Sequence, residues 1–184
     1  MPVSTSFHEI KKSINLPTDK DIILITSCSM GFGKIKEIVE SILKNVPEVY
    51  VVTICGNNDK LYSILNNINN PNIIVKGYVN NINEYIQASK IILTKPGGLT
   101  STEVAVIRKP MIHLMPIPGV ESYNAEFFCE NGLSLISSNI EEVVKNTMKL
   151  LKDKNMQETI TKNQSKIINR DSAKDLVNFV LKKF

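Results

Sequence analysis

The chain has 184 residues, 42% of them hydrophobic and 22% charged, and a formal net charge of +4. This composition is typical of one soluble globular domain, and no apolar run approaches the ~20 residues of a membrane span. Three widely spaced cysteines and two isolated histidines argue against disulfides and a metal site, and no basic tract interleaved with aromatic residues indicates nucleic-acid binding. The first residues lack the segments of a signal peptide, so we expect a cytoplasmic protein.

Apolar patterning predicts alternating strands and helices within one domain, 1–184. A lead-in, 1–17, contains a short helix over 9–14. Continuous β-branched and aliphatic runs predict strands at 22–25, 49–54, 73–75, 91–93, 111–114 and 132–136. Apolar residues at helical spacing predict helices at 35–43, 61–68, 82–88, 99–107, 121–129, 140–151 and 156–168. A terminal helix in 170–184 has a predicted core face of Leu176, Val177, Val180 and Leu181. His113 lies in an apolar run and is interpreted as a strand residue rather than a ligand.

This alternation predicts an α/β fold, a Rossmann-like parallel sheet with helices on both faces. The carboxyl ends of parallel strands share one edge of the sheet, so the loops that follow the strands converge there. Five such loops contain glycine: 27–33, 55–58, 77–79, 96–100 and 116–121. Their convergence indicates a ligand site at that edge.

Among these loops, 96–100 gives the most specific indication of the kind of ligand. Gly97 and Gly98 permit close approach to the backbone, and the unpaired N–H groups of the following helix favour an anion. Glu103, in the second helical turn, could accept two hydroxyls of a sugar. A nucleotide carries a phosphate close to two adjacent sugar hydroxyls, so this loop predicts a nucleotide ligand. The alternative is an ordinary strand–turn–helix whose N-cap is Thr or Ser.

Several motifs occur together in this chain: Lys95-Pro96-Gly97-Gly98-Leu99-Thr100, Glu103, Pro116-Ile117-Pro118-Gly119-Val120-Glu121 and Asn124-Ala125, together with Ser29-Met30-Gly31-Phe32-Gly33 and Gly77-Tyr78-Val79. This combination resembles the C-terminal domain of lipid glycosyltransferases of the GT-B type, glycosyltransferase family 28. It looks most like the monogalactosyldiacylglycerol synthases and processive diacylglycerol glucosyltransferases.

The resemblance implies a residue set for a donor, UDP-glucose or UDP-galactose. Backbone groups of Tyr78 and Val79 would hold uracil, and Glu103 would bind the ribose hydroxyls. Glu121 and Asn124 would face the hexose. The diphosphate would be surrounded by Gly31, Phe32, Gly33, Gly98, Leu99 and Thr100. The remaining donor-binding positions are Gly56, Pro96, Gly97, Gly119 and Val120.

The implied chemistry is displacement with inversion at the anomeric carbon. A helix N-terminus and backbone N–H groups can stabilise the leaving diphosphate, so no metal and no other cofactor is expected. The family's catalytic base belongs to the other domain, so no catalytic residue is assigned here. Two departures stand out. Val120 occupies a position where the family usually has Gln, and Ser27 and Cys28 stand where the first loop usually opens with glycines.

The expected partners are the UDP-sugar, an N-terminal acceptor domain missing from this chain, and a diacylglycerol-type lipid bound through that domain. The full enzyme would lie at the inner face of the cell membrane. A first alternative is a stand-alone donor-binding subunit of a split glycosyltransferase, paired with a membrane-bound acceptor subunit. A second is a nucleotide-sugar epimerase with its own acid and base, and a third is a Rossmann-like domain without a ligand.

Overall fold

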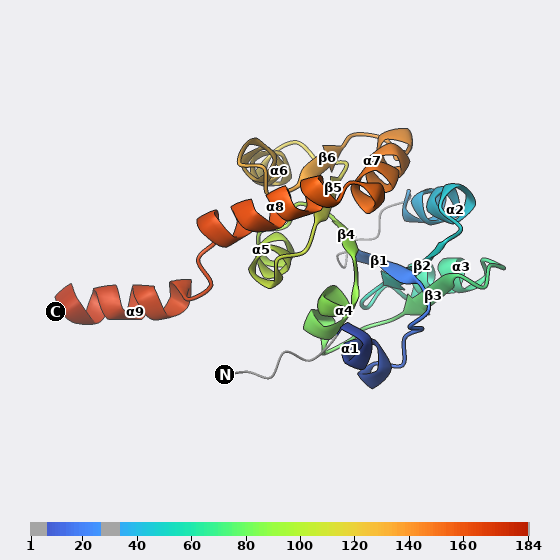
Figure 1. Cartoon of the computed structure of the whole chain (residues 1–184), viewed down its shortest axis with the longest axis horizontal. Helices are drawn as coiled ribbons and strands as arrows, with labels where there is room; N and C mark the ends of the chain where they lie inside the picture. Colours follow the sequence, from blue (N-terminus) through green and yellow to red (C-terminus); the bar gives the residue numbers. More distant parts are fainter. Residues whose placement is uncertain (1–6, 27–33, 184) are drawn as a thin grey trace.

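The computed structural model describes residues 7–26 and 34–183, in which helices enclose a parallel sheet (Figure 1). The described strands are β1 (Asp21–Thr26), β2 (Val49–Ile54), β3 (Ile73–Lys76), β4 (Ile91–Thr94), β5 (Met111–Leu114) and β6 (Leu135–Ser137). The described helices are α1 (Phe7–Ser13), α2 (Ile35–Asn45), α3 (Asp59–Asn66), α4 (Ile82–Ala88), α5 (Gly98–Ile107), α6 (Val120–Glu130), α7 (Ile140–Lys152), α8 (Lys154–Ile167) and α9 (Ser172–Lys183). The predicted loop 27–33, with Gly31, Phe32 and Gly33, lies outside the described residues.

The strand order is β3-β2-β1-β4-β5-β6, and neighbouring strands pair in parallel. The chain winds outward from β1 through β2 to β3 and then returns to β4 on the other side of β1. In such sheets the point of reversal opens a crevice beyond the carboxyl ends of the two strands, and ligands bind there. The last residues of β1 and β4 meet at this point, where the Thr26 hydroxyl donates to Thr94 Oγ1 at 2.7 Å in a buried contact.

Two hydrophobic cores cover the two faces of the sheet, because successive strand residues point to opposite sides. Ile23 and Ile25 of β1 belong to the first core, beneath α2, α3 and α7. Ile22 and Leu24 belong to the second core, beneath α4 and α5. The run 22–25 is buried throughout because helices pack on both sides of it. The predicted α/β class with helices on both faces is therefore confirmed.

The predicted core face of the terminal helix is wrong. The exposed fractions of Leu176, Val177, Val180 and Leu181 lie between 46% and 72%. After α8 the chain turns, and α9 extends away from the body of the molecule (Figure 1). The apolar spacing does mark one side of a helix, but within the described residues that side is not buried.

The last strand begins later than predicted. The interval 132–136 includes Gly132, whose φ of +64° places it in the left-handed region after α6. This conformation turns the chain before it can extend. Leu133 and Ser134 are buried on the way into the sheet, and β6 covers only Leu135–Ser137.

Candidate functional site

Four of the five predicted loops lie in the described residues, and all four follow strands of the parallel sheet. They therefore lie at its carboxyl edge. The loops after β4 and β5 adjoin the switch point, whereas Tyr78 and Val79 follow β3, three strands from β4. At about 4.8 Å per strand, β3 lies about 14 Å from β4. The edge thus suits an extended ligand better than a compact one.

The N-terminus of α5 faces this edge without a side-chain cap. Its N-cap is Gly97, with φ −76° and ψ 138°, so the alternative in which Thr or Ser caps the helix is wrong. Pro96 is buried, whereas Gly98 is exposed and the exposed fraction of Leu99 is 83%. Thr100 is half-buried and Glu103 is exposed. The first-turn N–H groups of α5 can therefore receive an anion from solvent.

Glu121 and Asn124 hold the loops after β4 and β5 together. The Lys95 ammonium donates to Glu121 Oε1 at 3.1 Å, and the Ile117 N–H donates to Glu121 Oε2 at 3.1 Å. Asn124 Nδ2 donates to the Pro96 carbonyl at 2.9 Å. We call these three contacts the loop clamp. The predicted contacts of Glu121 and Asn124 with a hexose remain a prediction.

Lys95 is a member of this site that the sequence reasoning missed. Its side chain is 10% exposed, and that of Glu121 is 27% exposed, so water screens this ion pair less than it screens a surface pair. Lys95 directly follows the buried strand β4 and begins the quoted motif. Its position was therefore visible in the sequence, but its partner, 26 residues away, was not.

A buried polar network fixes the first turns of α5 to the sheet. His113 of β5 is fully buried, with Nε2 2.9 Å from the Ser101 hydroxyl of α5 and Nδ1 3.1 Å from the Ser134 hydroxyl. The Phe128 ring meets the imidazole edge-on at 5.4 Å. Burial lowers the pKa of His113 to about 4, so the ring is neutral at pH 7. The interpretation of His113 as a strand residue is confirmed, and Ser101 is a supporting residue that the sequence did not indicate.

The loops at the other end of the edge differ in their exposure. Gly56 has φ +57°, a left-handed conformation that favours glycine. Its carbonyl oxygen lies 3.8 Å from the position that a Cβ atom would take at Gly77. The exposed fraction of Tyr78 is 72%, whereas Val79 packs against the second core. Val79 therefore anchors a segment whose backbone and Tyr78 side chain border the edge.

The loop after β5 ends in a second left-handed glycine. Gly119, the N-cap of α6, has φ +110° and ψ −135° and is exposed. Val120, the first residue of α6, is 76% exposed. An apolar side chain thus projects into solvent at the mouth of the site, beside the loop clamp.

Within 7–26 and 34–183, no group of three or more His, Cys, Asp or Glu side chains is placed to hold a metal ion. Among the helices of this part of the chain, none is both long enough and apolar enough to cross a membrane.

A doubly wound parallel sheet, with an uncapped helix N-terminus at its switch point, defines the chain as a Rossmann-like domain. The chain belongs to the glycosyltransferase family 28 C-terminal domain family, whose model matches residues 22–178.

Two sequence relatives agree with this assignment. The chain is 32% identical over 192 residues to the processive diacylglycerol beta-glucosyltransferase of Bacillus subtilis, covering 99% of this chain and 50% of the relative. It is 35% identical over 163 residues to the protein of the same name from Bacillus cereus strain G9842, covering 83% of this chain and 42% of the relative. The chain therefore spans about half the length of these curated relatives.

Solved structures share the fold at low sequence identity. MurG of Acinetobacter baumannii superposes with a TM-score of 0.72 at 18% identity, covering 94% of this chain and 52% of MurG. The UDP-GlcNAc 2-epimerase of Neisseria meningitidis, solved with UDP-GlcNAc bound, superposes with a TM-score of 0.74 at 17% identity. The match covers 98% of this chain and 50% of the epimerase. Transferases and epimerases thus share this architecture, so the fold alone does not choose between them.

Proposed function

We propose that this chain binds the UDP-hexose donor for an inverting glycosyltransferase that transfers glucose or galactose to diacylglycerol in glycolipid synthesis. The observation that carries the proposal is the uncapped N-terminus of α5 at the switch point, beside the loop clamp. The names of the sequence relatives support transfer to diacylglycerol, and they favour a transferase over an epimerase. The UDP-GlcNAc bound to the Neisseria meningitidis epimerase, which shares the fold, supports a UDP-sugar as the ligand.

The ligand would extend along the carboxyl edge. The first turn of α5, with Gly98, Leu99 and Thr100, would receive the diphosphate. Glu103, five residues beyond Gly98 on the same helix, would accept the two ribose hydroxyls, and the segment of Tyr78 and Val79 would border the uracil. The remaining diphosphate contacts would come from Gly31, Phe32 and Gly33.

The role of this chain in the reaction would be to stabilise the leaving group. The acceptor hydroxyl oxygen forms a bond to the anomeric carbon while the bond from that carbon to the diphosphate breaks, and UDP leaves with the electron pair. Preorganised N–H groups at a helix N-terminus stabilise such charge without reorganising. A base outside this chain would take the acceptor's proton.

The acceptor would be bound by a domain or a separate subunit outside these 184 residues. We propose that this acceptor-binding part holds the lipid at the inner face of the cell membrane. The length of the curated relatives, about twice that covered by this chain, supports the first arrangement. The split-subunit arrangement is the alternative.

The 184-residue chain is expected to bind UDP and to transfer no sugar. Affinity should be weak, on the order of 10–1000 μM, because only one wall of the crevice is present. Isothermal titration calorimetry with UDP measures it, and ADP serves as the base-mismatched control. Turnover of UDP-glucose or UDP-galactose onto diacylglycerol by this chain alone would contradict the assignment of the catalytic base to another part.

Val120 should limit discrimination between hexoses. A valine side chain can neither donate nor accept a hydrogen bond, so UDP should contribute nearly all the affinity. Val120→Gln should strengthen binding of one UDP-hexose by about 1 kcal/mol and leave UDP unchanged. Because Val120 is exposed, the substitution should not disturb folding. Titrations of the parent chain and of Val120→Gln with UDP, UDP-glucose and UDP-galactose test this prediction. A more than tenfold preference in the parent chain would show that other residues select the hexose.

A further inference from the structure

We propose that a second pocket, at the amino edge of the sheet and lined by Arg108, Lys109 and Arg170, binds a phosphate-bearing anion. This pocket has a volume of about 350 Å³. It lies where α4 and α5 end, whereas the donor crevice lies where α5 begins. The ten residues of α5 span about 15 Å, so the two sites are separate. The pocket does not depend on the proposed donor function.

The charged residues that line the pocket are all cationic. Three of its seven lining residues are cationic and none is acidic. Arg108 and Arg170 are also the only arginines in the sequence, among 22 basic residues. They lie 62 positions apart, so the fold and not the sequence brings them to one pocket. Arginine presents a planar fork of N–H donors that matches phosphate oxygens.

The backbone holds Arg108 in a conformation that a glycine would adopt more easily. Arg108 is the C-cap of α5, with φ 63° and ψ 58°. Residues other than glycine in this region carry strain, and such strain often marks functional positions. Binding of an anion by the guanidinium would explain why arginine occupies a position whose backbone conformation favours glycine.

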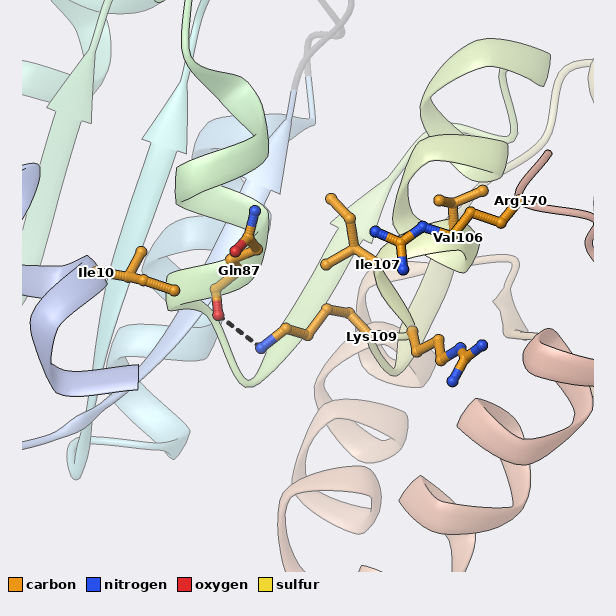
Figure 2. Close-up of a pocket in the computed structure, with 7 residues that line it drawn as sticks. Ile10, Gln87, Val106, Ile107, Lys109 and Arg170 are labelled. Atoms are coloured by element: carbon orange, nitrogen blue, oxygen red, sulfur yellow. Dashed lines mark hydrogen bonds between the residues drawn. The ribbon is translucent and has the colours of Figure 1, made fainter. Parts of the chain in front are cut away.

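Lys109 and Arg170 approach the pocket from different elements (Figure 2). The Lys109 ammonium donates to the carbonyls of Gln87 at 2.6 Å and Ser89 at 2.9 Å, which fixes it at the end of α4. The Arg170 side chain runs from the α8–α9 connection toward Ile107 (Figure 2). Arg108 and Arg170 are exposed, and the other lining residues include the apolar side chains of Ile10, Val106 and Ile107.

The cationic side chains are the part of the surroundings that favours an anion, because the carbonyl ends of α4 and α5 are themselves partly negative. Burial and the neighbouring charge of Lys11 lower the pKa of Lys109 to about 8. Asp21, an acid close to Lys11, is already paired with Lys90. Because none of the lining residues is acidic, a bound phosphate would offset the positive charge that gathers in this pocket. Both a phospholipid headgroup and a free phosphate ester carry this group.

The test compares two probes with the 184-residue chain. Glycerol 1-phosphate is titrated while the backbone amides are followed by NMR, and vesicles of phosphatidylcholine with 30 mol% phosphatidylglycerol are tested by cosedimentation. The amides of 106–109 should shift with glycerol 1-phosphate, and Arg108→Gln/Arg170→Gln should weaken this binding at least tenfold. The matched control, Lys44→Gln/Lys152→Gln, removes the same charge from exposed positions elsewhere and should bind as the parent does.

The two probes separate the sources of the phosphate. Vesicle binding that requires both arginines assigns the pocket to a lipid headgroup, whereas binding of glycerol 1-phosphate alone assigns it to a free phosphate ester. The proposal is overturned if the 106–109 amides do not shift, or if they shift equally in the arginine variant. Shifts at 97–100 in all variants would report the donor crevice and serve as an internal check that the chain is folded.

Discussion

The free energy of unfolding is expected to fall by about 3 kcal/mol through His113 alone as the pH is lowered from 6.5 to 4. Burial depresses the pKa of His113 to about 4 in the folded chain, whereas an unfolded histidine titrates near 6.5. Between these values the unfolded state binds a proton that the folded state excludes, so stability rises with pH in this window. Well above pH 6.5 His113 is neutral in both the folded and the unfolded state, so stability no longer changes with pH through this group.

Urea unfolding at several pH values measures this effect. His113→Gln removes the titrating group while keeping a side chain that can bond Ser101 or Ser134. Its stability should depend less steeply on pH between 4 and 6.5 than that of the parent. His8→Gln, which alters an exposed residue, should retain the parent's dependence. The same pH dependence in His113→Gln and the parent would show that the imidazole does not titrate as its burial requires.

Glu103→Gln is expected to weaken UDP binding by about 1.5–3 kcal/mol, or about ten- to hundredfold, and to leave pyrophosphate binding unchanged. A carboxylate can accept both hydroxyls of a ribose in charge-assisted hydrogen bonds, whereas the Gln amide offers one acceptor oxygen. Glu103 is exposed on α5, so the substitution should not disturb the core.

Calorimetric titrations with UDP and with pyrophosphate separate the ribose contribution from that of the diphosphate. Glu158→Gln, an exposed substitution on α8, is the matched control and should bind both ligands as the parent does. Equal UDP affinities for Glu103→Gln and the parent would identify Glu103 as an ordinary carboxylate on a helix surface.

The sequence predicted the sheet because its strands are apolar on both faces. A run such as 22–25 can only be buried between two layers, and turn residues mark where each strand ends. The same logic failed for α9, because an apolar stripe shows that a helix has a side to cover but not what covers it. It also misplaced the start of β6, since the left-handed turn at Gly132 delays extension of the chain.

The candidate site was predictable as a set of loops but not as a set of contacts. Parallel strands place the loops at one edge whatever their side chains do. The bond between Asn124 and Pro96 joins residues 28 positions apart, and that between Ser134 and His113 joins residues 21 apart. Such pairings depend on strand order and helix rotation, which no local pattern encodes.

The loop clamp has a consequence for the kinetics of binding at the carboxyl edge. Because Glu121 and Asn124 already tie the loop after β4 to the start of α6, a ligand entering there does not have to order these two segments. The conformational entropy that binding normally costs has been lost on folding, which raises the affinity available from each contact. Rearrangement of these two segments should therefore not slow association, and differences in affinity between related ligands should be found mainly in their dissociation rates.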